Sequence, residues 1–218
     1  EIEYALEKGV CHFDVDNFYE IECAQEIAKR LDKKVYATVR VTPGVTSGQH
    51  EFIQTGGKDT KFGFSTHDDS YMKAIGQIIE ASHMEFEGIH CHIGSQIFEM
   101  DAYTKAMEKF VQFALDIKNT YGVTIKNLNA GGGYGIAYNH EDTPLDFEEI
   151  TSAIMKTIKE GFEANHMEMP MVLIEPGRFV VGNAGITLYE IGSYKDIPGT
   201  RKYISVDGGM TDNIRTPL

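Results

Sequence analysis

Positive charge is scarce in this sequence. It has 20 Lys and Arg against 33 Asp and Glu, which gives a formal net charge of −13 at pH 7. A surface of this sign repels phosphate backbones and anionic headgroups, so neither nucleic acid nor an anionic membrane is expected as a partner. No apolar run is long enough to span a bilayer, and no signal peptide is recognisable.

Cysteine is also scarce. The three cysteines, Cys11, Cys23 and Cys91, are an odd number without paired spacing. This pattern argues against a disulfide framework and a zinc site, and it indicates a reducing, cytoplasmic setting. Cys91 lies inside an apolar run, where a cysteine usually packs as a small core residue.

Short β-rich runs alternate with amphipathic stretches along the 218 residues, whose 42% hydrophobic content suits one large core or two modest domains. The predicted strands are Val10–Val15, Lys34–Val41, Glu87–Ile93, Ile125–Ala130 and Met171–Ile174. The predicted helices are Glu1–Lys8, a segment from Asn17, Thr66–Ser82, Asp101–Thr120 and a segment from Asp146.

Polar residues and glycine mark several element ends. Asp101 is expected to cap the start of its helix and Gly122 to end it, while Asp146 and Glu149 form a capping box. The run Val172–Ile174 is continuously apolar, as in strands covered on both faces.

Strand followed by helix, repeated about five times, predicts a parallel α/β sheet with right-handed crossovers. A complete (β/α)8 TIM barrel needs about 250 residues, so residues 1–182 are predicted to form an incomplete barrel made of its later units. Phe179–Lys195 and Arg201–Val206 flank a Pro198-Gly199 turn and read as antiparallel strands. Residues 183–218 are therefore predicted to begin a carboxyl-terminal β domain.

Three short motifs follow three successive apolar runs at nearly equal intervals. They are His92–Gln96, Gly131–Gly135 and Glu175–Arg178. Each interval fits one strand, one crossover helix and two loops, so the motifs are expected to converge on one rim of the barrel. Together they suit a phosphorylated aromatic cofactor, and pyridoxal 5'-phosphate (PLP) fits best.

The glycine run is interpreted as an anion site. Gly131, Gly132 and Gly133 are expected to leave backbone N–H groups unobstructed at the end of a strand, which is a phosphate-binding arrangement. It is neither a Walker loop nor a Rossmann fingerprint, because the required spacings are absent. A flexible turn is the alternative.

Glu175-Pro176-Gly177-Arg178 follows the most apolar strand. A carboxylate there needs a partner, and at a pyridine nitrogen it would keep that nitrogen protonated, so that the ring withdraws electrons. Pro176 fixes the turn, Gly177 permits close approach of a ligand, and Arg178 suits bidentate recognition of a carboxylate or phosphate. A structural Glu–Arg pair is the alternative.

His90 and His92 share one face of their predicted strand. The pair could bind zinc, but no third ligand is evident, and no metal is expected. His92 is instead a candidate for stacking, as a neutral imidazole, on an aromatic cofactor, with Ser95 donating to its phosphate. His90 is expected to be a satisfied core residue. Arg215, in a glycine-rich polar region, is either a substrate ligand or part of an ordinary exposed loop.

Taken together, these strings resemble the fold-type III PLP-dependent decarboxylases. The resemblance covers nearly the whole chain and also includes Tyr4–Val10, Arg40–Gly44, Lys61–Gly63, Val206–Met210 and Ile214-Arg215. The histidine motif reads Cys-His-Ile-Gly-Ser-Gln where ornithine and arginine decarboxylases usually read Phe-His-Val-Gly-Ser-Gly. With Asn183–Thr187, this favours the diaminopimelate branch.

The resemblance implies the following roles. His92 stacks on PLP and Glu175 bonds its pyridine nitrogen, so both count as catalytic. Cofactor contacts also come from Ser95, Gly131, Gly132, Gly133, Pro176, Gly177 and Arg178. Arg178 and Arg215 bind the amino-acid substrate.

The implied reaction is decarboxylation of meso-2,6-diaminoheptanedioate to L-lysine and CO2 by a homodimeric enzyme. The family's Schiff-base lysine string has no match here, so the chain itself is expected to be inactive and the activity to belong to a longer parent. An ornithine- or arginine-type decarboxylase and a non-catalytic PLP-fold binding protein are the alternatives. An open sheet would expose two strand edges, which favours self-association.

Overall fold

The computed structural model describes residues 1–45 and 61–212. Arg215 therefore lies outside the described residues. The chain divides into two compact units, residues 1–180 and residues 181–218. The first unit holds a parallel sheet with its helices, and the second holds a hairpin.

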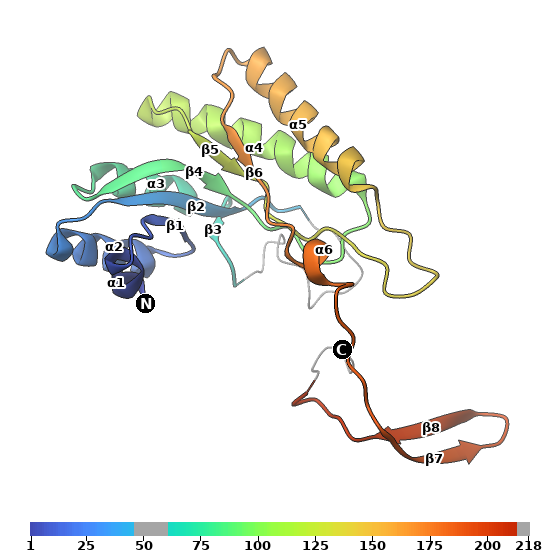
Figure 1. Ribbon diagram of the computed structural model, residues 1–218. Coiled ribbons are helices and arrows are strands. Elements are labelled where there is room, and N and C mark those ends of the chain that lie inside the picture. Colours follow the sequence, from blue (N-terminus) through green and yellow to red (C-terminus); the bar gives the residue numbers. More distant parts are fainter. Residues whose placement is uncertain (46–60, 213–218) are drawn as a thin grey trace. The chain divides into compact units, whose positions relative to one another are not determined.

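The first unit is built on a six-stranded parallel sheet (Figure 1). Its main path runs in chain order through β1 (His12–Val15), β2 (Val35–Thr42), β4 (Met84–His90), β5 (Asn127–Asn129) and β6 (Met171–Leu173). The five predicted strands are confirmed with shifted ends. The two-residue strand β3 (Phe64–Ser65), which pairs with the end of β2, was not predicted.

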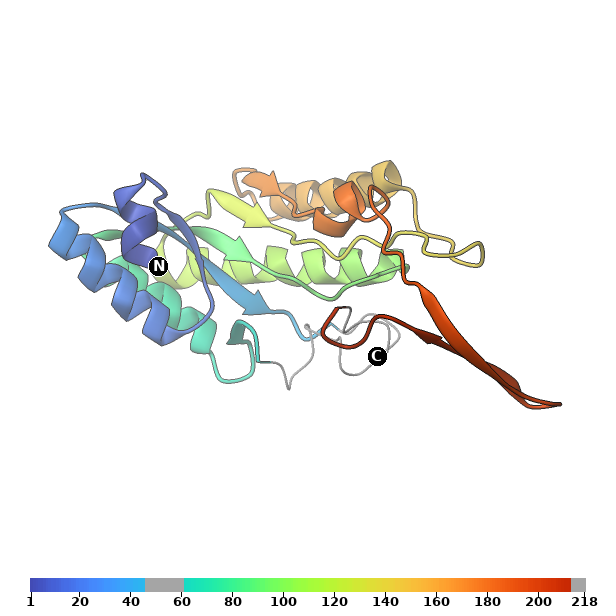
Figure 2. The same cartoon turned by 60° about the horizontal axis from the view of Figure 1, so that its bottom comes forward.

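Helices precede, connect and follow the parallel strands. They are α1 (Ile2–Glu7), α2 (Phe18–Leu31), α3 (Ser70–Glu80), α4 (Met100–Tyr121), α5 (Phe147–Ala164) and α6 (Gly177–Val181). Because the strand order advances in one direction, right-handed crossovers place α2 to α5 on one side of the sheet (Figure 2). This arrangement is an open parallel α/β sheet, since β1 and β6 form its two ends and do not pair with each other.

Of the predicted helix ends, the Gly122 stop and the Asp146 half of the capping box are confirmed. The Asp146 carboxylate accepts hydrogen bonds from the N–H groups of Glu148 and Glu149, and Gly122 ends α4 at φ +68°. The prediction that Asp101 caps α4 is wrong, because the helix begins at Met100. Asp101 is already inside the first turn, where it pairs with Lys105 at 3.2 Å.

The sheet has an apolar face and a polar face. Apolar side chains pack between the strands and the helices, and Ile89, Leu128 and Phe110 are fully buried there. On the other face the parallel register aligns Arg40 with His90, and His90 with Asn129. Equivalent positions of paired parallel strands point to the same side, so polar groups from separate strands form one row.

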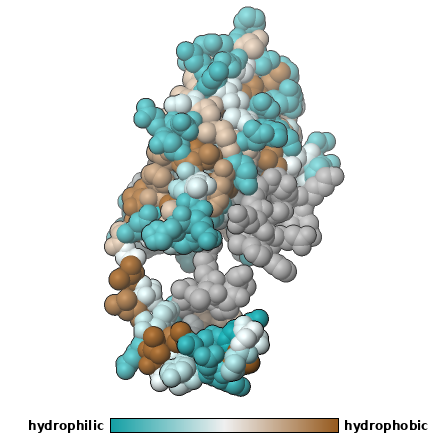
Figure 3. Space-filling model, turned by 90° about the vertical axis from the view of Figure 1, so that its right-hand side faces the viewer, coloured by the Kyte–Doolittle hydropathy of each residue, from teal (hydrophilic) through white to brown (hydrophobic). Residues whose placement is uncertain are grey.

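The strand β6 lies at the end of the sheet and pairs only with β5 among the described strands. Met171 is 59% exposed and Leu173 38%. The prediction that Val172–Ile174 is covered on both faces is therefore wrong for this chain. An apolar sequence favours burial, but burial also requires a neighbouring element, and the described residues supply none on this side of β6. Exposed hydrophobic side chains also appear among hydrophilic ones in the side view of Figure 3.

Because one edge of β6 has no partner strand among the described residues, we predict that the 218-residue chain self-associates. A strand with one unpaired edge and apolar side chains is a template for pairing with another chain. Met171→Lys will shift the population toward monomer in sedimentation velocity, because a lysine at an edge opposes pairing. Met155→Lys is the matched control, since Met155 is an exposed methionine on α5 and away from the edge. A wild-type chain that sediments only as monomer would contradict the prediction.

The second unit contains the hairpin of β7 (Ile191–Ile197) and β8 (Arg201–Val206), which are antiparallel as predicted. The first hairpin strand is shorter than predicted. Phe179–Val181 belongs to α6, and Ile191 is the first residue of β7. A two-stranded hairpin buries little apolar surface, so this unit has no core of its own within the described residues.

No helix among the described residues combines the length and the apolar character that crossing a bilayer requires.

Candidate active site

The three sequence motifs meet beyond the carboxyl ends of β4, β5 and β6. They line one cavity of about 220 Å³, formed by His92, Ser95, Gly133, Tyr134, Glu175, Pro176, Gly177, Arg178 and Phe179. His92 lies two residues past the end of β4 rather than inside the strand as predicted. The chain leaves the sheet there because β4 and β5 pair only as far as His90 and Asn129.

The glycine run allows neighbouring strand ends to approach closely. A Cβ on Gly131 would lie 2.0 Å from the Cys91 carbonyl oxygen, and one on Gly132 would lie 2.2 Å from that of Glu175. Gly131 and Gly133 also have φ values of +70° and +88°, in the left-handed region that favours glycine. Only glycine fits here, because any side chain would collide with the backbone of the neighbouring motifs.

The amides of this run are not all unobstructed, which corrects the interpretation made from sequence. The Gly131 N–H donates to Asn129 Oδ1 at 3.0 Å, and the Gly132 N–H donates to His92 Nδ1 at 3.4 Å. The side chains that accept these hydrogen bonds come from β5, which the run follows, and from the loop after β4. Gly133 is the glycine of the run that lines the cavity.

His92 is held as a flat, neutral ring at the cavity wall. Burial is the main cause that lowers the pKa of His92 below its ordinary value of 6.5, and the nearby Arg40 and His90 lower it further. Its Nδ1 accepts the Gly132 amide, which fixes the orientation of the ring. A neutral imidazole of fixed orientation is suited to packing against an aromatic ring.

Arg178 and Ser95 form the cationic part of the cavity. The guanidinium donates to Ser95 Oγ and to the Tyr138 hydroxyl, each at 2.8 Å. Arg178 is not paired with Glu175 in the ion pairs of the described residues, so the structural Glu–Arg pair is not what the strand end contains. The sequence did not indicate Tyr138.

Glu175 is held in the ionised form by partners on other strands. His90 Nε2 lies 3.3 Å from Glu175 Oε2, and Asn129 Nδ2 donates to Oε1 at 2.9 Å. The His90 imidazole is the main cause that lowers the pKa of Glu175 to about 2, against the opposing effect of burial. Because this pKa lies below the ordinary 4.5, the stabilisation is present above pH 4.5 and is lost as the pH falls toward 2.

Asn129 and His90 were not selected from the sequence as site residues. The expectation that His90 is a satisfied core residue is wrong. Its side chain is buried, yet neither ring nitrogen has a hydrogen-bond partner of good geometry among the described residues. The available signal was position, since His90 and Asn129 each lie two places before a motif residue and are the last residues of β4 and β5.

The Gln96 side chain links the loop after β4 to the loop after β5. Its amide donates to the Ile136 carbonyl oxygen at 2.6 Å and accepts the Ile136 N–H at 3.1 Å. The Ile97 N–H also donates to the Gly133 carbonyl oxygen at 3.0 Å. These contacts hold the loop after β4 beside the loop after β5. Gln96 makes them with a left-handed φ of +60°, a backbone conformation that is unfavourable for a residue other than glycine.

Replacing Gln96 by alanine is expected to lower the free energy of unfolding by about 2 kcal/mol, because the buried Ile136 N–H and carbonyl lose their partners. Gln112→Ala is the matched control, since its amide donates only to Asp116 on the exposed face of α4, and a change below about 0.5 kcal/mol is expected. Denaturant unfolding measures both. Equal effects of the two substitutions would contradict a stabilising role for the hydrogen bonds between Gln96 and Ile136.

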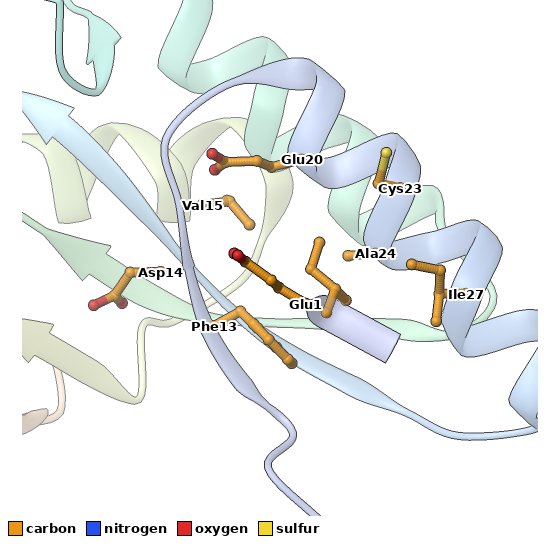
Figure 4. Close-up of a pocket in the computed structure, with 9 residues that line it drawn as sticks. Glu1, Phe13, Asp14, Val15, Glu20, Cys23, Ala24 and Ile27 are labelled. Carbon is orange, nitrogen blue, oxygen red and sulfur yellow. The ribbon is translucent and has the colours of Figure 1, made fainter. Parts of the chain in front are cut away.

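A larger cavity of about 460 Å³ lies elsewhere in the first unit, between α1, β1 and α2 (Figure 4). Glu1, Phe13, Glu20 and Cys23 are among its lining residues, and it contains none of the motif residues. Size therefore does not locate the candidate site here. The smaller cavity is the one where polar groups from three strand ends converge.

The donor set of the smaller cavity fits a phosphorylated pyridine ring. Arg178 and Ser95 offer a cation and a hydroxyl for a phosphate, His92 offers a flat ring, and Glu175 offers an ionised carboxylate. The absence of a side chain on Gly177 leaves open space, since nothing lies within 4 Å of the position of its Cβ. Fold and site together define a barrel-type α/β domain that binds a pyridoxal cofactor.

The chain belongs to the pyridoxal-dependent decarboxylases of fold type III. Residues 1–182 match the profile described as the pyridoxal binding domain of pyridoxal-dependent decarboxylases. Within the family the chain is diaminopimelate decarboxylase-like. It is 42% identical over its whole length to the diaminopimelate decarboxylase of Bacillus subtilis and 40% identical to that of Staphylococcus aureus.

Solved structures agree with this assignment. The diaminopimelate decarboxylase from M. jannaschii, crystallised with L-lysine, superposes with a TM-score of 0.84 at 32% identity over 98% of this chain and 48% of that chain. The Helicobacter pylori enzyme shares the fold, with a TM-score of 0.83 at 24% identity over 99% of this chain and 51% of that one. The chain spans about half the length of the curated relatives, 50% in the two cases above.

Proposed function

We propose that the protein containing this chain decarboxylates meso-2,6-diaminoheptanedioate to L-lysine and CO2 with PLP as cofactor. The observation that carries the proposal is the meeting of His92, Glu175 and Arg178 at one cavity. The identity of about 40% to diaminopimelate decarboxylases over the full chain supports the choice of substrate.

Bound PLP supplies a positively charged ring that accepts the electron pair released when the substrate carboxylate leaves as CO2. Glu175, ionised at neutral pH, is proposed to hold a proton on the pyridine nitrogen and so keep that ring positive. His92 is proposed to pack against the ring face and keep water from it. The other motif residues position the cofactor and the substrate.

Ser95, Arg178 and the backbone of Gly131–Gly133 are proposed to hold the phosphate, with Gly133 the glycine nearest the cavity. Pro176 and Gly177 shape the turn beside it. Arg178 and Arg215 are proposed to bind substrate carboxylates, because a substrate with two carboxylates and two amines needs more than one cation. Arg215 lies outside the described residues, so its role rests on sequence alone.

Two elements of the proposal lie beyond the cavity. The Schiff-base lysine string of the family has no match in residues 1–218, so that lysine is proposed to come from the rest of a longer protein. The active form is proposed to be a homodimer. The 218-residue chain alone is then expected to give no turnover.

A segment exchange tests the proposed function. Residues 1–218 replace the matched segment of the Bacillus subtilis relative, and the hybrid is assayed for CO2 and lysine release from diaminopimelate. Cofactor absorbance and circular dichroism show whether the hybrid folds and binds PLP. The proposal expects turnover of diaminopimelate above that of ornithine and arginine.

The opposite outcomes identify the alternatives. A folded, PLP-containing hybrid that releases CO2 faster from ornithine or arginine would replace the substrate assignment. A folded hybrid that binds PLP and decarboxylates none of the three would favour a non-catalytic binding protein. The unmodified Bacillus subtilis enzyme is the positive control.

A further inference from the structure

His90 is a buried imidazole between two carboxylates. It is the last residue of β4 and is 5% exposed. Its Nε2 lies 3.3 Å from Glu175 Oε2, and its Nδ1 lies 4.0 Å from Asp14 Oδ2. Neither nitrogen has a hydrogen-bond partner of good geometry in the described part of the chain. Burying a polar ring without hydrogen bonds costs free energy, so its position between two carboxylates calls for an explanation.

The sheet itself brings these three residues together. Asp14 is aligned with Thr38 on β2, and Arg40, two residues later on the same strand, is aligned with His90. Side chains two apart on a strand share a face, so Asp14 and His90 belong to the same polar row. Figure 4 agrees, because the Asp14 side chain points away from the other residues around the larger cavity.

A shared metal ion explains this cluster less well. One ligand atom from each of Asp14, His90 and Glu175 lies within 4.8 Å of the others, which is compatible with an ion. The two carboxylates, however, approach opposite nitrogens of the ring, which is the geometry of a bridging imidazole. Glu175 also has a second partner in Asn129 and lines the cofactor cavity.

We propose that His90 is a positioning residue that links Asp14 to Glu175 and keeps the Glu175 carboxylate ionised and aimed at the pyridine nitrogen. This inference rests on the proposed function, because it assigns Glu175 to that nitrogen. His90 touches neither cofactor nor substrate in this role. It acts through Glu175, and Asp14 balances the ring from its other side.

Titratable groups from several strands lie around the cluster. Asp14 comes from β1, Arg40 from β2, His92 from the end of β4 and Glu175 from the end of β6. Burial, and then the charge of Glu175, raise the pKa of Asp14, while His90 and Arg40 oppose this change. The Asp14 side chain remains 39% exposed, so it can exchange protons with solvent.

The first test measures the Glu175 carboxyl group directly in the 218-residue chain without cofactor. Carbon-13 NMR of labelled glutamate, assigned with Glu175→Gln, follows its titration. His90→Leu is expected to raise the pKa of Glu175 from about 2 to its ordinary 4.5 or above. His90→Gln, whose amide can reach the position of Nε2, is expected to restore part of the shift. His67→Leu, an exposed histidine, is the matched control and should change nothing.

The second test measures turnover in the hybrid enzyme described above. His90→Leu is expected to lower kcat at least tenfold with KM nearly unchanged and to alter the cofactor absorbance spectrum. His90→Gln should recover part of kcat. Asp14→Asn gives an independent variant should His90→Leu fail to fold. Because Asp14 and Glu175 carry like charges, this variant is expected to lower the pKa of Glu175, and an unchanged pKa would show that Asp14 is not coupled to Glu175.

Distinct results separate the two proposals. If the unsubstituted hybrid folds but lacks PLP or turnover, the proposed function fails, while the Glu175 titration still reports on His90. If that hybrid is active and His90→Leu leaves both kcat and the Glu175 pKa unchanged, the positioning role is wrong. Stoichiometric Zn²⁺ binding that is lost in His90→Gln and Asp14→Asn would also overturn it in favour of a metal site.

Discussion

Glutamine in place of Glu175 will lower turnover of the hybrid enzyme by about 10²–10³-fold, the usual effect of removing one charge-stabilising group from an active site. A neutral amide does not hold a proton on a pyridine nitrogen, so a bound cofactor would lack the positive charge that favours release of the substrate carboxylate as CO2. The loss is expected in kcat, because Glu175 is proposed to touch the cofactor and not the substrate. Steady-state CO2 release measures it.

This substitution is expected to preserve the fold. A glutamine at position 175 can still accept the Asn129 amide hydrogen bond through its side-chain oxygen. Glu160→Gln, on the exposed face of α5, is the matched control and should leave turnover unchanged. A Glu175→Gln enzyme within threefold of the parent would remove Glu175 from the chemistry.

Alanine in place of Gly131 will lower the free energy of unfolding by about 3 kcal/mol. The new Cβ would lie 2.0 Å from the Cys91 carbonyl oxygen. Neither atom can move by rotation of a side chain, so the backbones at the two strand ends must separate. The left-handed φ of +70° adds strain to any residue other than glycine. Thermal or denaturant unfolding measures the loss.

The matched control is Gly177→Ala, compared for stability alone. Nothing lies within 4 Å of a Cβ at that position, and its φ is not in the left-handed region. We expect a change below about 0.5 kcal/mol. A Gly131→Ala protein as stable as the Gly177→Ala protein would show that the strand ends do not need their close approach.

Much of the site could be predicted from sequence because parallel strands end on one edge of a sheet. His92, Gly133, Glu175 and Arg178 each follow an apolar strand, and the structure places them around one cavity. The regular spacing of strands and helices was sufficient for this. The chemical roles assigned to these residues remain predictions.

The partners of the motif residues could not be predicted in the same way. Asn129 and His90 act on Glu175, and Tyr138 acts on Arg178, through contacts between residues about 40 or more positions apart. Such contacts depend on strand register, which no local pattern encodes. The same reason explains Gly132, whose amide donates to His92, 40 positions away, instead of remaining open.

The sequence by itself determined the alternation of strands and helices, the parallel sheet and the order of the three motifs, because these follow from local periodicity and from residues such as Gly122 and Asp146. Only the tertiary structure decided which charges meet. The register of the parallel strands sets Asp14, His90 and Asn129 in one polar row beside Glu175, and it leaves β6 paired with β5 alone among the described strands. Distances between strands decide electrostatics, and those distances exist only once the sheet has formed.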